Sequence, residues 1–83
     1  MTTKILFTVY DSKSESYLAP FSYKTTGEAV RSFTDVVNDP NTAFNKHPED
    51  FVLYKVGGFS EVSGSVFPLD PHVCLGKAID FVK

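Results

Sequence analysis

The 83-residue chain is poor in several features that would narrow its chemistry. It has one cysteine, Cys74, so no disulfide can form within the chain, and a reducing compartment is its natural setting. No apolar run approaches the roughly 18 residues that a membrane-spanning helix needs. Residues 1–10 have no signal-peptide cleavage pattern. These absences predict a soluble protein of the cytosol with no membrane association.

An excess of charge of either sign is also missing. The net charge is −2 and the isoelectric point is near 5.5, whereas a protein that binds nucleic acid electrostatically is normally basic. This balance argues against a uniformly basic surface but leaves room for a local basic face. An aromatic content of 14% argues against disorder, and the length predicts a single domain over residues 1–83.

Motifs of the common enzyme classes are absent from the sequence as well. It contains no Walker loop, no dinucleotide-binding GxGxxG and no HExxH zinc motif. His72 and Cys74 are two residues apart, which places them on one face of a strand without making a catalytic pair. His47, His72 and Cys74 do not match a zinc-site spacing. We therefore expect no catalytic residue, no metal and no cofactor, and we expect that the chain is not an enzyme.

What the chain does contain begins with four strand-like segments, of which the first and third carry apolar residues on both faces. They are residues 4–11, 16–23, 51–59 and 65–69. Short polar turns predict that the first two strands form one hairpin and that the last two form another. Pro20 and Pro68 cannot donate to a sheet ladder, so the second and fourth strands are expected at the edges of the sheet.

A helix is predicted between the two hairpins. The sequence TTGE at residues 25–28 fits a capping box, and the Asp39–Pro40 pair ends the helix. The apolar stripe between them is Ala29, Val30, Phe33, Val36 and Val37. Apolar spacing over residues 75–82 predicts a short C-terminal helix. The expected fold is α+β: a four-stranded antiparallel sheet with one main helix on one face (ββαββ) and a short C-terminal helix.

Aromatic residues on the strands, with lysines nearby, are typical of platforms that bind single-stranded nucleic acid. The strand aromatics are Tyr10, Tyr17, Phe21, Tyr23 and Tyr54, and the alternation in residues 16–23 predicts that Tyr17, Phe21 and Tyr23 share one face. The alternative is that they are core or cross-strand pairs. The candidate nucleic-acid-binding residues are Lys4, Tyr10, Lys24, Arg31, Lys46, His47, Tyr54 and Lys55.

The polar stretch FNKHPED at residues 44–50 permits two interpretations. In the first, Glu49 or Asp50 pairs with Lys46 or His47, and the stretch is a loop brace at the entrance to the third strand. In the second, Lys46 and His47 contact phosphate. The two carboxylates offset the two cations, which favours the brace.

Three stretches in order resemble one family: VYDSKSESYLAPF, TTGEAVRSFTDVVNDP and FNKHPEDFVLYKVGGFSEVSG. They are similar to the small nonstructural protein of gokushovirus-type phages, which are Microviridae with circular single-stranded DNA genomes. The resemblance runs from about Val9 to Gly64 and continues more loosely to CLGKAIDF. It implies a role in viral DNA replication, in the switch to single-stranded genome synthesis and packaging, in the host cytoplasm. It carries over no catalytic residue.

Two hypotheses follow from the residues and the resemblance together. The first is a module that binds single-stranded DNA and acts as a homodimer, because a thin core of this size gains from association. The second is an adaptor that contacts the phage replication initiator or a host replication factor without touching DNA. The acidic isoelectric point favours the second, and the aromatic strands favour the first.

Overall fold

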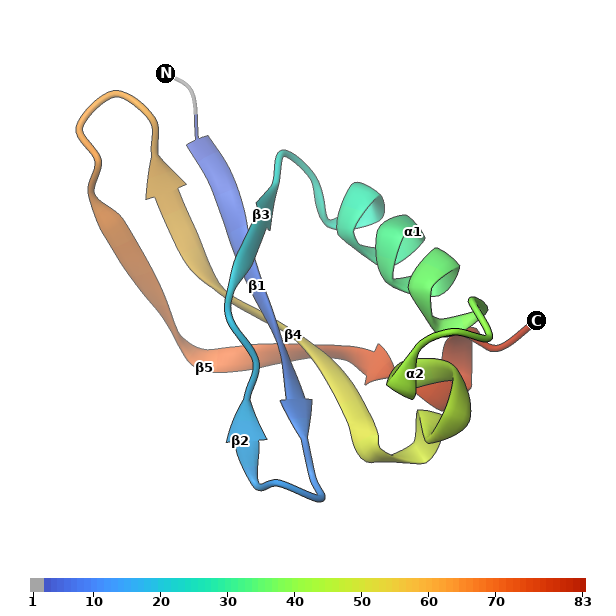
Figure 1. The fold of residues 1–83 in the computed structure, drawn as a ribbon. Helices are drawn as coiled ribbons and strands as arrows, with labels where there is room; N and C mark the ends of the chain where they lie inside the picture. The colour runs from blue at the N-terminus through green and yellow to red at the C-terminus, as the bar shows by residue number, and fades with distance from the viewer. Residues whose placement is uncertain (1–2) are drawn as a thin grey trace.

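The computed structural model describes residues 3–83 and contains an antiparallel sheet with one main helix, α1 (Thr26–Val37), over one of its faces (Figure 1). The strands are β1 (Thr3–Asp11), β2 (Ser16–Tyr17), β3 (Phe21–Tyr23), β4 (Phe51–Ser60) and β5 (Val66–Lys77). Their order across the sheet is β2-β1-β4-β5, and β3 also pairs with β1. The α+β class and the central position of β1 and β4 are confirmed, as is the edge position of the second and fourth predicted segments.

The predicted count of four strands is wrong, because the second strand is broken into β2 and β3. Tyr17 and Phe21 were expected on one face, but Tyr17 packs on Tyr10 while Phe21 stacks on Phe7 in the core. Leu18 to Pro20 have no ladder pairing, and Pro20 has no N–H to donate. The chain therefore changes faces within this link.

The helix α1 begins and ends where the sequence predicts. The Thr25 side chain accepts a hydrogen bond from the Glu28 backbone N–H at 3.1 Å, and its hydroxyl donates to the Glu28 carboxylate at 3.2 Å. Asn38 is the C-cap. Three residues of the predicted stripe, Ala29, Phe33 and Val37, are buried against the sheet. The amphipathic pattern thus directs one face of α1 onto the core.

The segment between α1 and β4 was predicted as a loop, but it contains two helical turns. They are α2 (Ala43–Lys46), capped by the Thr42 hydroxyl, and the 3₁₀ turn η1 (Pro48–Asp50) with proline at its start. Phe44 anchors the segment as expected, with ring centroids 4.6 Å from Phe51 and 5.7 Å from Phe33.

The short C-terminal helix predicted over residues 75–82 is confirmed only in part, because it is shorter than expected and is not an α-helix. β5 continues to Lys77, and only a 3₁₀ turn, η2 (Ala78–Phe81), follows it. Gly76 has φ of +140°, which no helix allows, and the Phe81 ring lies 3.0 Å from where a Cβ of residue 76 would be. Leu75 and Ala78 reach the core from a strand and a 3₁₀ turn, which reproduces the spacing of a helical stripe.

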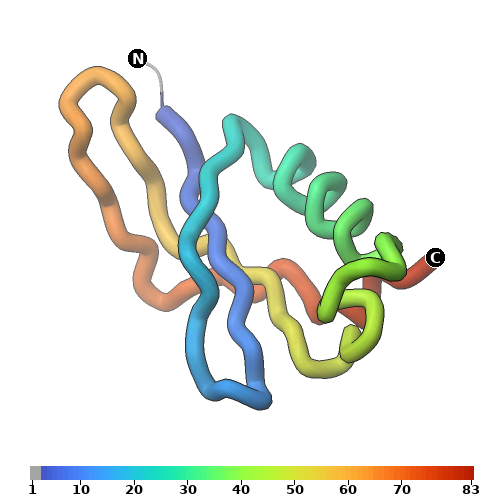
Figure 2. The backbone as a smooth tube through the Cα atoms, viewed as in Figure 1, coloured from blue at the N-terminus to red at the C-terminus, as the bar shows by residue number. Residues whose placement is uncertain are grey.

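The core lies between α1 and the inner parts of β1 and β4. Its buried members are Phe7, Val9, Ala29, Phe33, Val37, Phe51, Leu53 and Ala78. The distal part of the β4–β5 hairpin extends beyond the helix layer, and the C-terminus lies beside the end of α1 (Figure 2). This projection gives the molecule its extents of 39 × 23 × 18 Å. The second face of the sheet carries no helix within residues 3–83.

Candidate nucleic-acid interface

Four aromatic side chains gather on the face of the sheet opposite α1. Tyr17 is their hub: its ring centroid lies 4.9 Å from Tyr10, 6.1 Å from Tyr54 and 6.1 Å from His72. Tyr54 and His72 are 6.4 Å apart. We call these four residues the Tyr17 cluster. Centroid separations under about 7 Å are those of rings in direct contact, so a base would stack on the outer surface of the cluster and not between its rings.

Strand register explains how the tyrosines meet. Tyr10 on β1 is directly opposite Tyr17 on β2, and Thr8 on the same strand is directly opposite Tyr54 on β4. Thr8 and Tyr10 are two residues apart and so share a face, and directly opposite residues of antiparallel strands also share a face. The three tyrosines, from three neighbouring strands, therefore lie on one side of the sheet.

A bulge in β5 brings His72 to the cluster. Val73 pairs with Lys55 and Pro68 pairs with Gly57, so four residues of β5, 69–72, lie opposite Val56 alone. A bulge of this kind bends the strand and redirects its side chains. His72 lies at the end of this bulge, and its ring reaches both Tyr17 and Tyr54.

The cluster is open to solvent at its hub. The Tyr17 side chain is 52% exposed, and His72 is exposed as well, whereas Tyr10 and Tyr54 are half-buried beneath them. Burial raises the pKa of Tyr54, and the negative charges that Cys74, Tyr17 and Tyr10 acquire on ionisation raise it further. Tyr54 therefore stays neutral at physiological pH, and its ring, like the others of the cluster, offers a surface on which a base can stack.

The predicted site residues divide between the two sides of the sheet. Tyr10 and Tyr54 belong to the Tyr17 cluster. Lys4 shares their face of β1 by period-two alternation, and its ammonium lies 3.9 Å from the Glu61 carboxylate. Lys55 lies opposite Phe7 and next to Tyr54, so it points to the other face.

The remaining predicted cations lie around the helical layer. They are Lys24, which precedes the α1 cap, Arg31 on α1, Lys46 on α2 and His47 at the end of α2. All four are exposed. The structure therefore gathers two of the eight predicted residues, Tyr10 and Tyr54, into one aromatic surface, with Lys4 on the same side.

The FNKHPED stretch is held by backbone groups and not by the expected ion pairs. Across residues 3–83, the ion pair within 4.0 Å is the one between Lys4 and Glu61. Instead, the Asp50 carbonyl oxygen accepts two hydrogen bonds from Ser12. The Ser12 backbone N–H donates at 2.9 Å and the Ser12 hydroxyl donates at 3.0 Å. This bracing joins the segment to the turn after β1.

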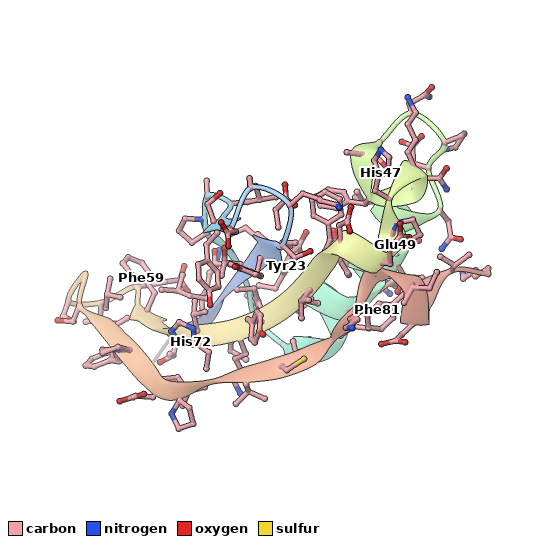
Figure 3. The ribbon with its side chains drawn as sticks, turned by 90° about the horizontal axis from the view of Figure 1, so that it is seen from below. Tyr23, His47, Glu49, Phe59, His72 and Phe81 are labelled. Atoms are coloured by element: carbon pink, nitrogen blue, oxygen red, sulfur yellow. The ribbon has the colours of Figure 1, made fainter. Side chains whose placement is uncertain are left out.

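Three potential metal-ligand atoms in the same stretch, from His47, Glu49 and Asp50, lie within 4.8 Å of one another. Figure 3 places His47 and Glu49 together at the α2 end of the molecule, far from His72. His47 and Glu49 are exposed, and exposed acidic groups are common without a metal. The three residues therefore form a solvated polar surface, separate from the Tyr17 cluster.

Two members of the Tyr17 cluster were not among the predicted site residues. Tyr17 was recognised as a strand aromatic, and its pairing with Tyr10 could have been found by counting across the hairpin turn. His72 had no such signal, because the bulge that carries it depends on how β5 pairs with β4.

A family model described as Phage ORF5 protein matches residues 4–81. The chain belongs to the Phage ORF5 protein family. It is 34% identical over 71 residues to Protein ORF5 of Chlamydia phage 1, a gokushovirus, and this alignment covers 81% of the chain and 74% of that protein. The resemblance to small gokushovirus proteins is thereby confirmed. No solved structure matches the chain.

The Phage ORF5 match extends from β1 to the end of η2, so the Tyr17 cluster and the helical layer both lie within the matched region. In the part of the chain that the structure describes, no helix has the length and apolar character needed to cross a bilayer. The family match therefore identifies a phage protein. Any inference about what the protein binds rests on its surface residues.

Proposed function

We propose that this member of the Phage ORF5 family is a non-enzymatic nonstructural protein that binds single-stranded DNA. It would act in viral DNA replication in the host cytoplasm, during the switch to single-stranded genome synthesis and packaging. The observation that carries the proposal is the Tyr17 cluster, with an exposed hub, on a sheet face that no described helix covers. Aromatic side chains on an open face stack with unpaired bases, which duplex DNA does not offer.

The overall acidity of the chain limits how the binding works. With a net charge of −2, phosphate attraction is local and weak, so stacking supplies a larger share of the affinity than in a basic protein. Binding to single strands should exceed binding to duplex of the same sequence. It should also weaken as salt rises, because the few phosphate contacts release counterions.

The first test is fluorescence anisotropy of a labelled single-stranded oligonucleotide, titrated with the protein at two salt concentrations. Tyr17→Ala removes the hub and should weaken binding by about 1–3 kcal/mol, the usual value of one stacked base. The matched control is Tyr23→Phe, because Tyr23 packs on Phe7 on the opposite side and its hydroxyl donates to Ser32. Absence of binding at low salt would contradict the proposal.

Cys74 supplies an independent test of where the DNA lies. It is the single cysteine, it is exposed, and it pairs with Tyr54 on the Tyr17-cluster face. Bound DNA should slow the alkylation of Cys74 by a maleimide. The control combines Cys74→Ser with Asn41→Cys, which moves the thiol to an exposed position beyond α1. Equal protection of both thiols would argue against binding at this face.

A second candidate function rests on a different surface, the distal β4–β5 hairpin. Val62, Val66 and Phe67 there are 77%, 60% and 55% exposed. Exposed apolar groups of this size favour a protein contact, and the adaptor hypothesis names the phage replication initiator or a host replication factor as the partner. Titration of purified initiator against the labelled protein tests it. An interaction lost in a Val66→Ser/Phe67→Ser variant that still binds DNA would separate the two functions.

A further inference from the structure

The Tyr17-cluster face carries a cation that the sequence did not indicate, Lys77 at the end of β5. One cross-strand row joins Tyr10 on β1, Val52 on β4 and Lys77 on β5. Residues directly opposite one another in antiparallel strands share a face. The neighbours of Val52 and Lys77, which are Leu53 and Ala78, are completely buried on the helix side. Val52 and Lys77 therefore point to the side of the Tyr17 cluster.

The backbone at Lys77 is held firmly while its side chain is exposed. Its N–H donates to the Asp80 carboxylate at 3.0 Å, and the preceding Gly76 packs against the Phe81 ring. Within residues 3–83 the Lys77 ammonium forms no ion pair, whereas Lys4 on the same face is close to Glu61. Of these two cations, Lys77 is the one whose ammonium has no carboxylate within ion-pair distance among residues 3–83.

The position of Lys77 fits a phosphate contact beside stacked bases. Neighbouring strands are about 4.8 Å apart, so two spacings place the backbone of Lys77 about 10 Å from that of Tyr10. A lysine side chain bridges much of this separation and carries its ammonium on a flexible stem, which suits a phosphate contact of variable geometry. The Asp80 carboxylate, the nearest described acid in sequence, accepts from the Lys77 backbone N–H and forms no ion pair with the Lys77 ammonium.

We propose that Lys77 is the phosphate-binding cation of this interface, and that a bound single strand crosses β1, β4 and β5 from Tyr17 toward Lys77. This inference rests on the proposed function, since it assigns a path to the DNA on the same face. It also gives Lys77 the role that the sequence assigned to Lys55. Lys55 lies opposite Phe7 and Val73 and points to the other side of the sheet.

The test compares Lys77→Gln with Lys55→Gln in the full chain, because both remove one positive charge from neighbouring strands but from opposite faces. The measurement is the dissociation constant for a single-stranded oligonucleotide across about 50–200 mM salt. Lys77→Gln should weaken binding several-fold at low salt. It should also reduce the slope of log affinity against log salt by about 0.7, the value of one lost phosphate contact on a single strand. Lys55→Gln should change the slope by much less.

The outcomes separate this inference from the proposed function. If Tyr17→Ala weakens binding while Lys77→Gln leaves affinity and salt slope unchanged, the DNA-binding face stands and the role of Lys77 is rejected. Equal effects of the two glutamine variants would also reject it, because they would reflect net charge alone. If the wild-type protein does not bind single strands, both ideas are wrong. Circular dichroism of both variants checks that the fold is retained.

Discussion

The hydroxyl of Thr8 donates a 2.6 Å hydrogen bond to the carbonyl oxygen of Leu18. Thr8 is 5% exposed, and the Leu18 N–H also donates to the Val9 carbonyl at 2.9 Å. These two bonds hold the link between β2 and β3 against β1. The chain changes faces within this link, so the two bonds fix the segment between Tyr17 in the exposed cluster and Phe21 in the core.

Replacing Thr8 with valine should destabilise the protein and weaken DNA binding together. Valine retains the shape of threonine but has no hydroxyl, so the Leu18 carbonyl oxygen loses its hydrogen-bond donor. The loss of such a bond costs about 1–3 kcal/mol of folding free energy. Urea unfolding followed by circular dichroism measures the free energy of unfolding. Thr8→Ser is the control, because it keeps the hydroxyl. A Thr8→Val protein as stable as wild type would show that the bond does not hold the link.

The adjacent glycines of β4 should respond very differently to alanine. A Cβ at Gly57 would clash with the backbone oxygen of Phe67, whereas a Cβ at Gly58 would meet nothing closer than 3.7 Å. Backbone atoms cannot move aside cheaply, so Gly57→Ala should cost about 1–3 kcal/mol through strain in the β4–β5 pairing.

Gly58→Ala is the matched control for Gly57→Ala, one residue away in the same strand. Ordinary van der Waals contact at this position predicts little change in stability. Thermal unfolding of both variants checks the difference. Equal melting temperatures would mean that β4 and β5 do not approach each other as closely at Gly57 as described.

Asn38 ties the C-terminal segment to the end of α1. Its Nδ2 donates to the carbonyl oxygens of Thr34 at 2.7 Å and Phe81 at 3.0 Å, and its Oδ1 accepts from the Lys83 N–H at 2.9 Å. Asn38→Ala removes all three bonds and should lower stability by about 1–3 kcal/mol. It should also speed hydrogen exchange in residues 78–83.

The control for Asn38→Ala is Asn41→Ala, because Asn41 is exposed and bonds through its backbone N–H, which alanine keeps. Unfolding by urea and exchange measured by mass spectrometry compare the two variants. Unchanged exchange at the C-terminus of Asn38→Ala would indicate that Phe81 packing alone holds this segment.

Short sequence patterns were sufficient to predict those elements whose bounds are set by neighbouring residues in the chain. The Thr25 cap, the Asp39–Pro40 stop and the apolar stripe defined α1, and Pro20 and Pro68 identified the edge strands. The C-terminal error had a physical origin: the spacing of Leu75 and Ala78 fits a helix and equally fits a bulged strand that enters a 3₁₀ turn.

The candidate site was less accessible to sequence reasoning because it depends on pairing. Tyr10 and Tyr54 were recognised as strand aromatics, but the partners that complete the site come from tertiary structure. Tyr17 depends on the bond between Thr8 and Leu18, and His72 depends on the β5 bulge. A list of lysines close to aromatics in sequence could not distinguish Lys55 from Lys77, which register places on opposite faces.

Self-association through the distal hairpin remains a prediction. Among residues 3–83 the core contains eight buried apolar residues, while Val62, Val66 and Phe67 are more than half exposed. Small domains with thin cores gain stability by burying such groups between copies. Sedimentation velocity at tens of micromolar should detect a dimer, and Val66→Ser/Phe67→Ser should shift it to monomer. Detection of monomer alone for the wild-type protein would overturn the prediction.

Stability should fall at alkaline pH because of Tyr54. Burial raises the pKa of Tyr54 above its ordinary value of 10.0, so the folded state holds the phenol proton more tightly than the unfolded chain. The unfolded chain loses this proton first as pH rises. The contribution of Tyr54 is therefore fully present below pH 10 and is lost as pH rises through the folded-state pKa.

Tyr54→Phe isolates this effect, since it keeps the ring in the Tyr17 cluster and removes the titrating group. Urea unfolding midpoints measured from neutral pH to above pH 10 should fall more steeply for the wild-type protein than for Tyr54→Phe. The comparison is between slopes, so any difference in stability at neutral pH does not affect it. Parallel slopes for the two proteins would mean that Tyr54 is solvated as freely in the folded state as in the unfolded chain, and that the cluster is looser than described.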